Sequence, residues 1–395
     1  MSDATLLLVG SGRLLTPQPY DGALPWAVLV RGTQFAWIGP RKAAPPSDDV
    51  ADLGSALVTP GLVDAHTHPA FLGDRSDEAA ARLAGAPYEG GGILRTVRAT
   101  REGSDAQLRD AIAGRLRAAL STGTTTIECK SGYGLSTTEE LRALRLIGEA
   151  AAVLPIRVVR TFLGAHAIPR ESASADAYAE TVATEMLPAV AAERLAEFCD
   201  VFCDRGFFSL AATEAILGAA RRLGLAIRLH ADQLARTGAT ELAVRLGAVS
   251  ADHLEQLDDP GVAALAGSGV VATLLPGPAL VMRDRLPPAR ALLDSGVTVA
   301  LASDANAGTF GSSSMPLVIG LGATLLGMTV AEAVTAATAG GAASLGLSRE
   351  RGAIRPGADA DLVAWDAEHE GAFALHMADV RPLRTWIDGV EVGGD

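Results

Sequence analysis

Short apolar runs alternate with longer stretches of helical periodicity between residues 59 and 345. Eight such runs stand out, and each is followed by a plausible helix. They are GLVDAH (61–66), TTTIECK (124–130), IRVVRTFLG (156–164), EFCDVFC (197–203), AIRLHAD (226–232), VSADH (249–253), VVATLLPG (270–277) and VTVALASDA (297–305). Repeated strand–helix units indicate a parallel sheet covered by helices. Eight units predict an α/β fold of the (β/α)8 TIM-barrel type.

The stretches between the runs carry helical signals of their own. Leu108, Ile112, Leu116 and Leu120 recur every four residues, as on the buried face of a helix. Ser136 and Glu139 have the spacing of a capping box, which predicts a helix start. A doubly wound open sheet uses the same units, but no glycine fingerprint follows the first run. The pattern therefore favours the barrel.

Both ends of the chain have a different pattern, with short apolar runs separated by glycine and proline. The first sixty residues contain TLLLVG, RLLT, AVLVRG and FAWIGP, which predict hairpin-linked strands. Near the other end, GAIRPGADADLVAWD and RTWIDGVEV are strand-like, and the second includes an Asp-Gly turn signal. We therefore expect β-rich segments on both sides of the barrel.

Composition and charge exclude several classes of protein. The chain is 49% hydrophobic and 20% charged, which is typical of a globular enzyme and not of a disordered chain. A net charge of −13 without a basic cluster argues against nucleic-acid binding. The beginning lacks the pattern of a signal peptide, and no apolar run is long enough for a membrane span. Three cysteines without CxxC spacing fit a reducing compartment, so we expect a cytoplasmic protein with buried cysteines.

Polar side chains follow the ends of the predicted strands, where the active sites of such barrels lie. Five of the seven histidines and one aspartate occupy these positions. In chain order they are His66, His68, His166, His230, His253 and Asp304. We expect these side chains to meet at one mouth of the barrel.

A metal site is the simplest explanation of this coincidence. Alternate residues of an extended segment point the same way, roughly 7 Å apart, so His66 and His68 can face one ion. An isolated His-x-His is more often two satisfied polar residues than two ligands. Three imidazoles and one carboxylate, however, leave a position open for water, as in catalytic sites. The sequence predicts a metal held by His66, His68, His230 and Asp304, and these ligands suit zinc and iron.

The same arrangement resembles the amidohydrolase superfamily, whose members carry His-x-His after strand one, histidines after strands five and six, and aspartate after strand eight. The resemblance implies a small composite β-sandwich domain of residues 1–58 and 346–395 beside a hydrolase barrel of residues 59–345. Many binuclear members bridge two metals through a lysine after strand four. The lysines of this chain are Lys42 and Lys130, neither of which is placed there. We therefore expect one transition metal per chain, Zn²⁺ or Fe³⁺.

Seven short strings resemble one family of that superfamily, the imidazolonepropionases. They are KSGYGL, FLGAHAIP, DVFCD, LHADQ, SADHLE, LLPG and SDANAGT, and their order extends the resemblance over nearly the whole chain. It implies hydrolysis of 4-imidazolone-5-propanoate to N-formimidoyl-L-glutamate in histidine degradation, by a homodimer. Another cyclic-amide hydrolase, or a nucleobase or guanidine deaminase, would use the same ligands. A non-enzymatic, metal-binding assembly protein is a further alternative, but the complete ligand set favours an enzyme.

Three residues form the expected catalytic set. Asp304 can take the proton of the attacking water and pass it to the leaving ring nitrogen. His253 can hydrogen-bond the water or the developing oxyanion, and its alternatives are a further metal ligand or a structural hydrogen bond. Gln233 stands where some members hold glutamate. Because glutamine cannot ionise, we expect Gln233 to orient the substrate, and the general acid stays open.

Arg75 is the expected partner of the substrate carboxylate, because arginine can engage a carboxylate through two parallel hydrogen bonds. The alternative is a surface salt bridge with Asp74 or Asp77. The resemblance implies further substrate contacts at Tyr133, His166, Gln233, Asn306, Gly308 and Thr309. The loop at residues 88–92 is shorter than the family pattern, which bears on the fit of the substrate.

Overall fold

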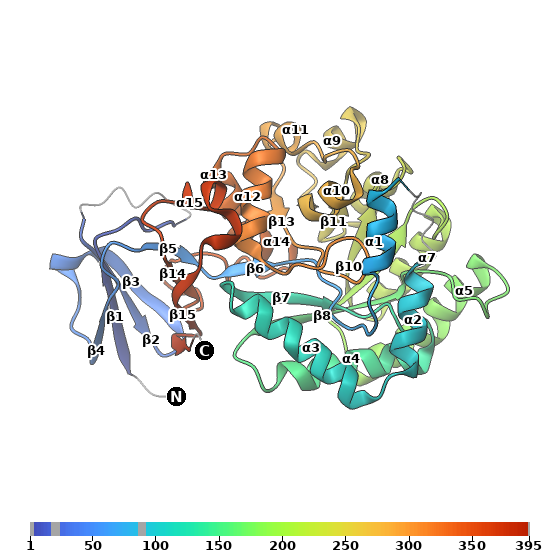
Figure 1. Cartoon of the computed structure of the whole chain (residues 1–395), viewed down its shortest axis with the longest axis horizontal. Coiled ribbons are helices and arrows are strands. Elements are labelled where there is room, and N and C mark those ends of the chain that lie inside the picture. Colours follow the sequence, from blue (N-terminus) through green and yellow to red (C-terminus); the bar gives the residue numbers. More distant parts are fainter. Residues whose placement is uncertain (1–3, 17–23, 86–91, 394–395) are drawn as a thin grey trace.

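The largest element of the molecule is a barrel of eight parallel strands (Figure 1). The computed structural model describes residues 4–16, 24–85 and 92–393. The barrel strands follow one another around the sheet in chain order: β6 (Leu62–Asp64), β7 (Thr124–Lys130), β8 (Arg157–Ala165), β9 (Phe198–Cys203), β10 (Ala226–Ala231), β11 (Ser250–His253), β12 (Val271–Leu274) and β13 (Val299–Leu301). Seven lie within a predicted run and β8 extends one residue past its run, so the barrel prediction is confirmed.

The first and last strands of the barrel meet through the residues that follow them. Thr67 and Ala305 form a parallel bridge. The backbone N–H of Asp304 donates to the carbonyl oxygen of His66 at 2.9 Å, and the N–H of His68 donates to that of Ala305 at 2.9 Å. The seam of the barrel therefore runs through three of the four predicted metal ligands.

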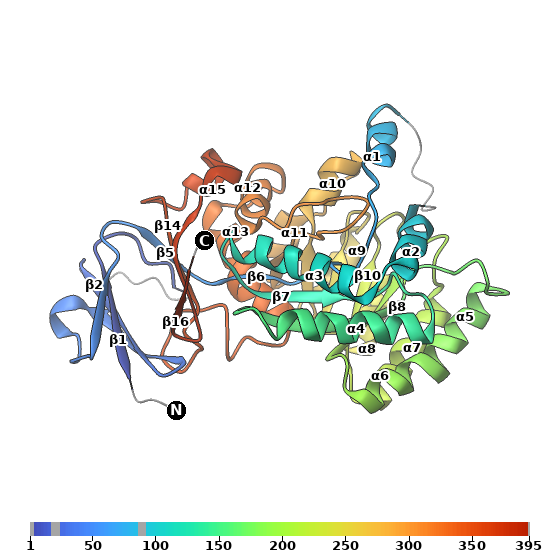
Figure 2. The same cartoon turned by 60° about the horizontal axis from the view of Figure 1, so that its bottom comes forward.

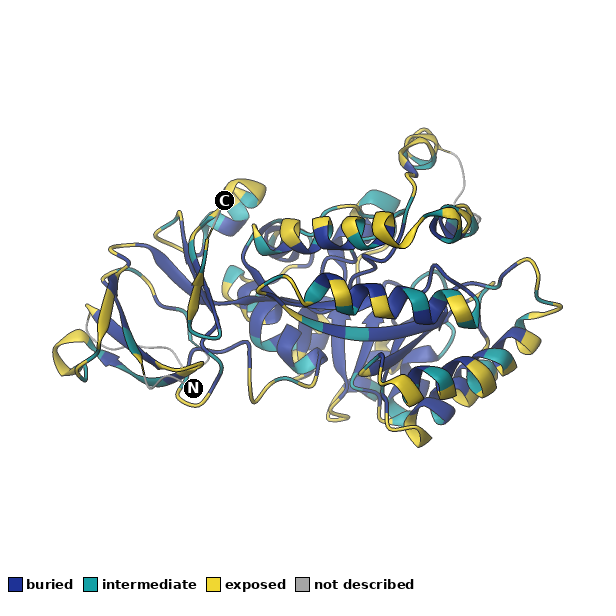
Figure 3. Ribbon diagram, turned by 90° about the horizontal axis from the view of Figure 1, so that it is seen from below, coloured by how far each residue is buried: buried dark blue, intermediate teal, exposed yellow. Residues whose placement is uncertain are grey.

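Helices cover the outside of the barrel, with buried residues toward the strands and exposed residues outward (Figure 3). They are α1 (Ser76–Leu83), α2 (Gly92–Glu102), α3 (Asp105–Leu120), α4 (Thr137–Ala151), α5 (Ala175–Thr181), η2 (Val182–Met186), α6 (Leu187–Glu193), α7 (Leu210–Arg222), α8 (Ala239–Leu246), α9 (Asp259–Leu265), α10 (Pro276–Met282), α11 (Ala289–Asp294), α12 (Met315–Leu325), α13 (Val330–Thr335), η3 (Ala336–Gly340) and α14 (Gly341–Ser344). Helices α3 and α4 lie side by side along one flank (Figure 2).

The predicted helix signals are confirmed in one case and half confirmed in the other. In α3, Leu108, Ile112 and Leu116 are buried against the barrel. At the start of α4, the Ser136 hydroxyl accepts a hydrogen bond from the backbone N–H of Glu139. The carboxylate of Glu139 does not complete a capping box, because it pairs with Arg142 at 2.8 Å.

Two small sheets from the ends of the chain lie beside the barrel (Figure 1). The first has the order β3-β2-β1-β4 and the second β16-β15-β14-β5. Their strands are β1 (Thr5–Gly10), β2 (Trp26–Arg31), β3 (Gln34–Pro40), β4 (Asp49–Asp52), β5 (Leu57–Pro60), β14 (Leu362–Trp365), β15 (Pro382–Ile387) and β16 (Val390–Val392). The short helices η1 (Arg41–Ala43), α15 (Ala372–Leu375) and η4 (Met377–Asp379) lie between strands.

A shared apolar core joins the two small sheets into a sandwich. Leu8, Val28 and Phe35 of the first sheet pack in one cluster with Leu362 and Trp386 of the second. Segments from opposite ends of the sequence therefore depend on each other for burial. The domain limits stay a prediction, and the expected boundary after residue 58 falls inside β5.

The predicted hairpins of the sandwich are partly confirmed. β2 pairs antiparallel with β3, and the Asp388–Gly389 turn joins β15 to β16. Both turn residues have positive φ, 50° and 76°, as a two-residue hairpin turn requires. β4 was not among the predicted runs, and it pairs parallel with β1. The hairpin prediction is wrong for RLLT, which contributes only a bridge from Leu14 to Val58.

Two expectations from composition concern burial. Cys129, Cys199 and Cys203 are buried free thiols, as predicted. Burial raises the pKa of Cys203 to about 11, so its thiol stays protonated near neutral pH. Across the described ranges, no helix combines the length and apolar character needed to cross a lipid bilayer.

Candidate metal centre and substrate pocket

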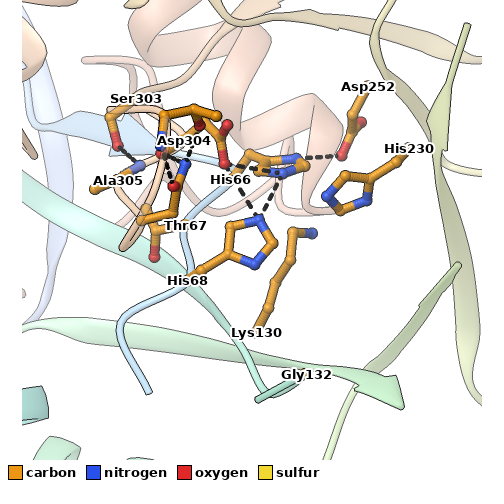
Figure 4. Close-up of polar contacts among 12 residues, drawn as sticks. His66, Thr67, His68, Lys130, Gly132, His230, Asp252, Ser303, Asp304 and Ala305 are labelled. Atoms are coloured by element: carbon orange, nitrogen blue, oxygen red, sulfur yellow. Dashed lines mark hydrogen bonds and ion pairs between the residues drawn. The ribbon is translucent and has the colours of Figure 1, made fainter. Parts of the chain in front are cut away.

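His66, His68 and Asp304 gather at the seam of the barrel (Figure 4). All three are buried. The Nε2 atoms of the two histidines lie 3.2 Å apart, and Oδ1 of Asp304 lies 3.2 Å from Nε2 of His68 and 3.6 Å from Nε2 of His66. Asp304 has a φ of 51°, a left-handed conformation that aspartate tolerates better than most residues. Three potential ligand atoms therefore face one small volume.

His230, at the end of β10, supplies the fourth predicted ligand. Its Nδ1 atom lies 2.9 Å from Oδ2 of Asp200 on the neighbouring strand β9. His66 has the same arrangement, with Nδ1 lying 2.7 Å from Oδ2 of Asp252. A carboxylate at Nδ1 fixes the ring orientation and leaves the Nε2 lone pair for a metal. His66, His68 and His230 offer nitrogen atoms within 4.8 Å of one another.

These residues fit a transition metal. Nε2 of His230 is buried without a hydrogen-bond partner among the described residues. Burying such an atom unpaired costs free energy that a cation ligated there would remove. Three imidazole nitrogens and a carboxylate oxygen form a donor set that suits zinc or iron. A second group, formed by His66, His253 and Asp304, also has ligand atoms within 4.8 Å, so the alternative that His253 is a ligand stays open.

Burial makes the ligand imidazoles neutral, as metal ligands must be. It holds the pKa of His66 and of His68 well below the usual value, and it lowers the pKa of His230 to about 3. Burial also acts to lower the pKa of His253, but Glu255 and Asp304 outweigh it, and the net shift is upward. His253 is therefore the imidazole of this group that holds a proton most readily.

Beneath the ligands lies a buried charge network that the sequence analysis missed. It consists of Glu128, Lys130, Asp200, Arg228 and Asp252, all without solvent exposure. Nζ of Lys130 lies 2.6 Å from Glu128 and 2.7 Å from Asp200. Nη2 of Arg228 lies 2.7 Å from Asp252, and its Nη1 lies 3.4 Å from Glu128. The network places a cation beside each carboxylate that orients a histidine.

The network also explains why Asp200 stays ionised. Burial acts to raise the pKa of Asp200, but His230 and Lys130 outweigh it and hold that pKa well below its usual range. A sequence signal for these residues existed. Glu128 and Lys130 alternate in ECK, and Arg228 and His230 alternate in RLH, so charged residues recur at every second position of otherwise apolar strands. These charged residues lie within the strands, whereas the predicted site residues lie at strand ends.

The ligands open onto a small space, the inner cavity, with a volume of about 40 Å³. It brings together every predicted catalytic and substrate residue, along with three of the four predicted ligands. The lining residues are His68, Arg75, Ile93, Tyr133, His166, Phe202, His230, Gln233, His253, Asp304, Asn306, Gly308 and Thr309. His66 lies deeper, and Ile93 and Phe202 were not predicted.

Tyr133 and His166 form one side of the inner cavity, with ring centres 5.1 Å apart. Glu140 holds their loop by accepting hydrogen bonds from the backbone N–H groups of Gly132, Gly134 and Leu135. Nδ1 of His166 donates to the carbonyl oxygen of Gly132 at 2.9 Å. Burial lowers the pKa of His166 to about 3, so Nε2 of the neutral ring is an acceptor. An acceptor suits an N–H group of a substrate and not a carbonyl oxygen.

Arg75 is buried at the edge of the inner cavity, although a surface salt bridge was the alternative. Its carboxylate partner is Glu78 of α1, with Nη2 at 2.7 Å from Oε1 and Nε at 3.0 Å from Oε2. Neither Asp74 nor Asp77 takes that position. A Cβ atom on Gly308 would lie 2.4 Å from Nη1 of Arg75. Glycine is therefore needed for the guanidinium to lie against this loop.

Asn306 and Gln233 line the inner cavity in different ways. Oδ1 of Asn306 accepts from the backbone N–H groups of Gly308 and Thr309, and Nδ2 donates to the carbonyl oxygen of Asp304. Both ends of its amide are thus used to shape the loop. The backbone N–H of Gln233 donates to Asp204 at 3.0 Å, and its side chain lies at the cavity. Tyr88 and the rest of segment 86–91, noted for its short length, lie outside the described residues.

Known proteins resemble this chain in sequence. The amidohydrolase family model matches residues 57–392. A protein of Acinetobacter baumannii (strain ACICU) named imidazolonepropionase is 42% identical over 375 residues, covering 93% of this chain and 94% of the relative. A protein of the same name from Salinispora arenicola (strain CNS-205) is 49% identical over 356 residues, covering 89% and 87%.

Solved structures share the fold at low sequence identity. A 5-methylcytosine deaminase from Klebsiella pneumoniae liganded with 5-fluorocytosine has a TM-score of 0.78 at 15% identity, covering 98% of this chain and 97% of that one. A zinc-bound adenosine deaminase from Xanthomonas campestris has a TM-score of 0.75 at 19% identity, covering 98% and 92%. At such identities the likeness supports the barrel and its flanking sandwich, not a substrate.

Proposed function

The chain belongs to the amidohydrolase family, and we propose from this premise that it hydrolyses 4-imidazolone-5-propanoate to N-formimidoyl-L-glutamate. The observation that carries the proposal is its identity of 42% to 49% with imidazolonepropionases over about nine-tenths of its length. The inner cavity supports it, because a cationic, an aromatic and several imidazole side chains surround the expected metal position.

The ligand set proposed for the metal is His66, His68, His230 and Asp304. A bound Zn²⁺ or Fe³⁺ would supply the Lewis acidity that makes water nucleophilic near neutral pH. Asp200 and Asp252 hold the rings of His230 and His66 so that Nε2 of each faces this point. One metal per chain is expected, and the choice between zinc and iron depends on availability.

Asp304 and His253 carry the proposed proton transfers. Asp304 accepts the proton of the attacking water as its oxygen bonds to the ring carbonyl carbon, and then delivers this proton to the leaving ring nitrogen. Burial raises the pKa of the Asp304 carboxyl, which favours this receipt of a proton. His253, whose pKa is also raised, donates a hydrogen bond to the carbonyl oxygen as negative charge develops there. Cleavage of the C–N bond leaves a new carboxylate and a protonated nitrogen.

Substrate binding is assigned to the rest of the inner cavity. Tyr133 packs against the imidazolone ring, and Nε2 of His166 accepts a hydrogen bond from a ring N–H. Arg75 faces the propionate, and Gln233 orients the ring. Asn306 shapes the wall, where Gly308 and Thr309 contact the substrate. These roles follow from the positions of the side chains around the cavity.

The test is turnover by purified protein of defined metal content. Turnover is measured as the loss of the ultraviolet absorbance of imidazolonepropanoate. We expect saturable hydrolysis that falls when a chelator removes the metal and returns on reloading. A panel of other cyclic amides, nucleobases and guanidines serves as the control. Turnover of a panel member without turnover of imidazolonepropanoate would overturn the proposal.

We further propose that the protein works in histidine degradation, in the cytoplasm, as a homodimer. The pathway follows from the proposed reaction, and the three free cysteines are consistent with a reducing compartment. The homodimer rests on the family resemblance. Light scattering during size-exclusion chromatography would test it, because a monomer mass would contradict it.

A further inference from the structure

A second, larger space, the outer cavity, adjoins the inner cavity. Its volume is about 350 Å³. Both spaces are lined by the same four residues, Arg75, Asn306, Gly308 and Thr309, which therefore form a common wall. The outer cavity is additionally lined by Phe71, Asp74, Arg115 and Phe310, among others. No role has been assigned to this space so far.

Arg115, in α3, is the unusual residue of the outer cavity. Its Nη1 atom donates to the carbonyl oxygens of Pro69 and Phe71 at 2.7 and 2.8 Å, and its guanidinium carbon lies 3.5 Å from the ring centre of Phe71. Within the described ranges, no carboxylate pairs with it, and Nε and Nη2 have no hydrogen-bond partner. Burial lowers its pKa to about 10 without an acid to offset the effect. Arg115 is thus a half-buried cation whose Nε and Nη2 can donate hydrogen bonds to a ligand.

The other charges nearby do not neutralise it. Glu78 is shared between Arg75 at 2.7 Å and Arg82 at 3.2 Å, so one carboxylate serves two guanidinium groups. Asp74 also lines the cavity, and its carboxylate stays negative while it accepts hydrogen bonds from the backbone N–H and hydroxyl of Ser76. Three guanidinium groups, those of Arg75, Arg82 and Arg115, therefore lie beside two carboxylates, and the one positive charge in excess favours an anion.

The inner cavity adjoins the predicted ligands, and the imidazolone ring has to reach them. The outer cavity is the larger of the two spaces, at about 350 Å³ against about 40 Å³. Because the ring must reach the metal position, the tail is the part left to extend past the common wall.

We propose that the outer cavity is the carboxylate subsite, where Arg115 binds the propionate group of the substrate together with Arg75. The inference rests on the proposed function and adds a specificity-determining residue to it. Arg115 supplies the N–H groups that Arg75 has already committed to Glu78. Selection for a carboxylate tail then depends on a residue of α3, outside the strand ends that carry the metal ligands.

The competing explanation is that Arg115 only holds the backbone of residues 69–71, next to His68. Arg115→Met and Arg115→Lys separate the two, with Arg117→Met as control, because Arg117 is an exposed arginine of the same helix. Each variant is assayed with the substrate and with its tail carboxamide. We expect Arg115→Met to raise KM for the acid about tenfold and to leave kcat/KM for the amide within about twofold.

Arg115→Lys should raise KM for the acid less than Arg115→Met does, because lysine keeps the positive charge. Arg117→Met should have the KM of the wild type. Equal losses for acid and amide, or an unchanged KM for the acid, would overturn the subsite. Calorimetry with glutarate on metal-loaded protein gives a reading independent of turnover. Weaker glutarate binding by Arg115→Met than by Arg117→Met supports the subsite even if the proposed reaction fails, and equal binding by the two variants overturns it.

Discussion

Two buried clusters of opposite charges occupy different parts of the molecule. At the barrel, the buried charge network surrounds Arg228 and Lys130. Beside the small sheets, Arg351 is paired with Asp361, Asp388 and Asp359, the last two at 2.6 and 3.2 Å. Both clusters bury a guanidinium among carboxylates. They differ in where their hydrogen bonds end.

In the Arg351 cluster, the ion pairs and the backbone hydrogen bond join members of the cluster to one another. Asp361 accepts the backbone N–H of Asp388 at 2.9 Å, so the cluster ties the β15–β16 turn to the start of β14. The barrel network instead ends on His66 and His230, and Nε2 of His230 is left without a partner in the described chain. Buried charge by itself therefore does not mark a functional site. The difference is that the barrel network ends on imidazoles of a group whose atoms could hold a metal ion.

Asp304→Asn should have the largest effect, when compared with Asp361→Asn. We expect turnover of imidazolonepropanoate to fall by about 10³-fold or more, because an amide cannot accept and return the proton. Asp361→Asn should retain turnover per folded molecule. The measurement is kcat on protein of equal metal content. An Asp304→Asn variant with a tenth of the activity would contradict the proposed proton path.

Exchange of the two arginines for methionine should separate the clusters by metal affinity. Arg228→Met and Arg351→Met both leave buried carboxylates unpaired, and each should lower the free energy of unfolding by about 3 to 5 kcal/mol. Arg228→Met should also weaken metal binding about 10- to 100-fold, since Asp252 orients His66 less firmly. Urea unfolding and chelator competition measure the two quantities. Equal metal affinities in the two variants would remove the proposed difference.

The smallest expected effect is a pH dependence of the Arg351 cluster. Burial raises the pKa of Asp361 to about 6, above the value of about 3.9 in the unfolded chain. Between these values the folded state holds a proton that the unfolded state releases, so stability falls as pH rises from about 4 to 6. The loss is about 3 kcal/mol. Urea unfolding at several pH values measures the free energy of unfolding of the wild type and of Asp361→Asn. The difference in favour of the wild type should shrink as pH rises through this window, and a constant difference would contradict the prediction.

The barrel was predictable because its signals repeat. Each strand is a short apolar run, and a predicted ligand such as His230 or Asp304 lies at the point where the run ends. The network residues were missed because Glu128 and Arg228 lie within strands, where buried charges depend on partners from neighbouring strands. Their pairing is a property of the closed sheet, which periodicity along one strand does not report.

The sandwich shows the same limit. The β15–β16 hairpin was predictable from its Asp-Gly turn, a local signal. The parallel pairing of β4 with β1 was not, because it depends on which edge of the sheet is free. Arg75 was singled out from the sequence, yet its contact with Glu78 and its approach to Gly308 arise only when α1 and the loop after β13 meet.

The seam between His66 and Asp304 sets an order of events during synthesis. These residues are separated by 238 positions, and their backbones bond to each other directly. A nascent chain that has not yet delivered residue 304 from the ribosome lacks both the seam and the fourth ligand. Metal acquisition by the complete site is therefore a late step, which follows translation of the last barrel strand and cannot guide the folding of the earlier ones.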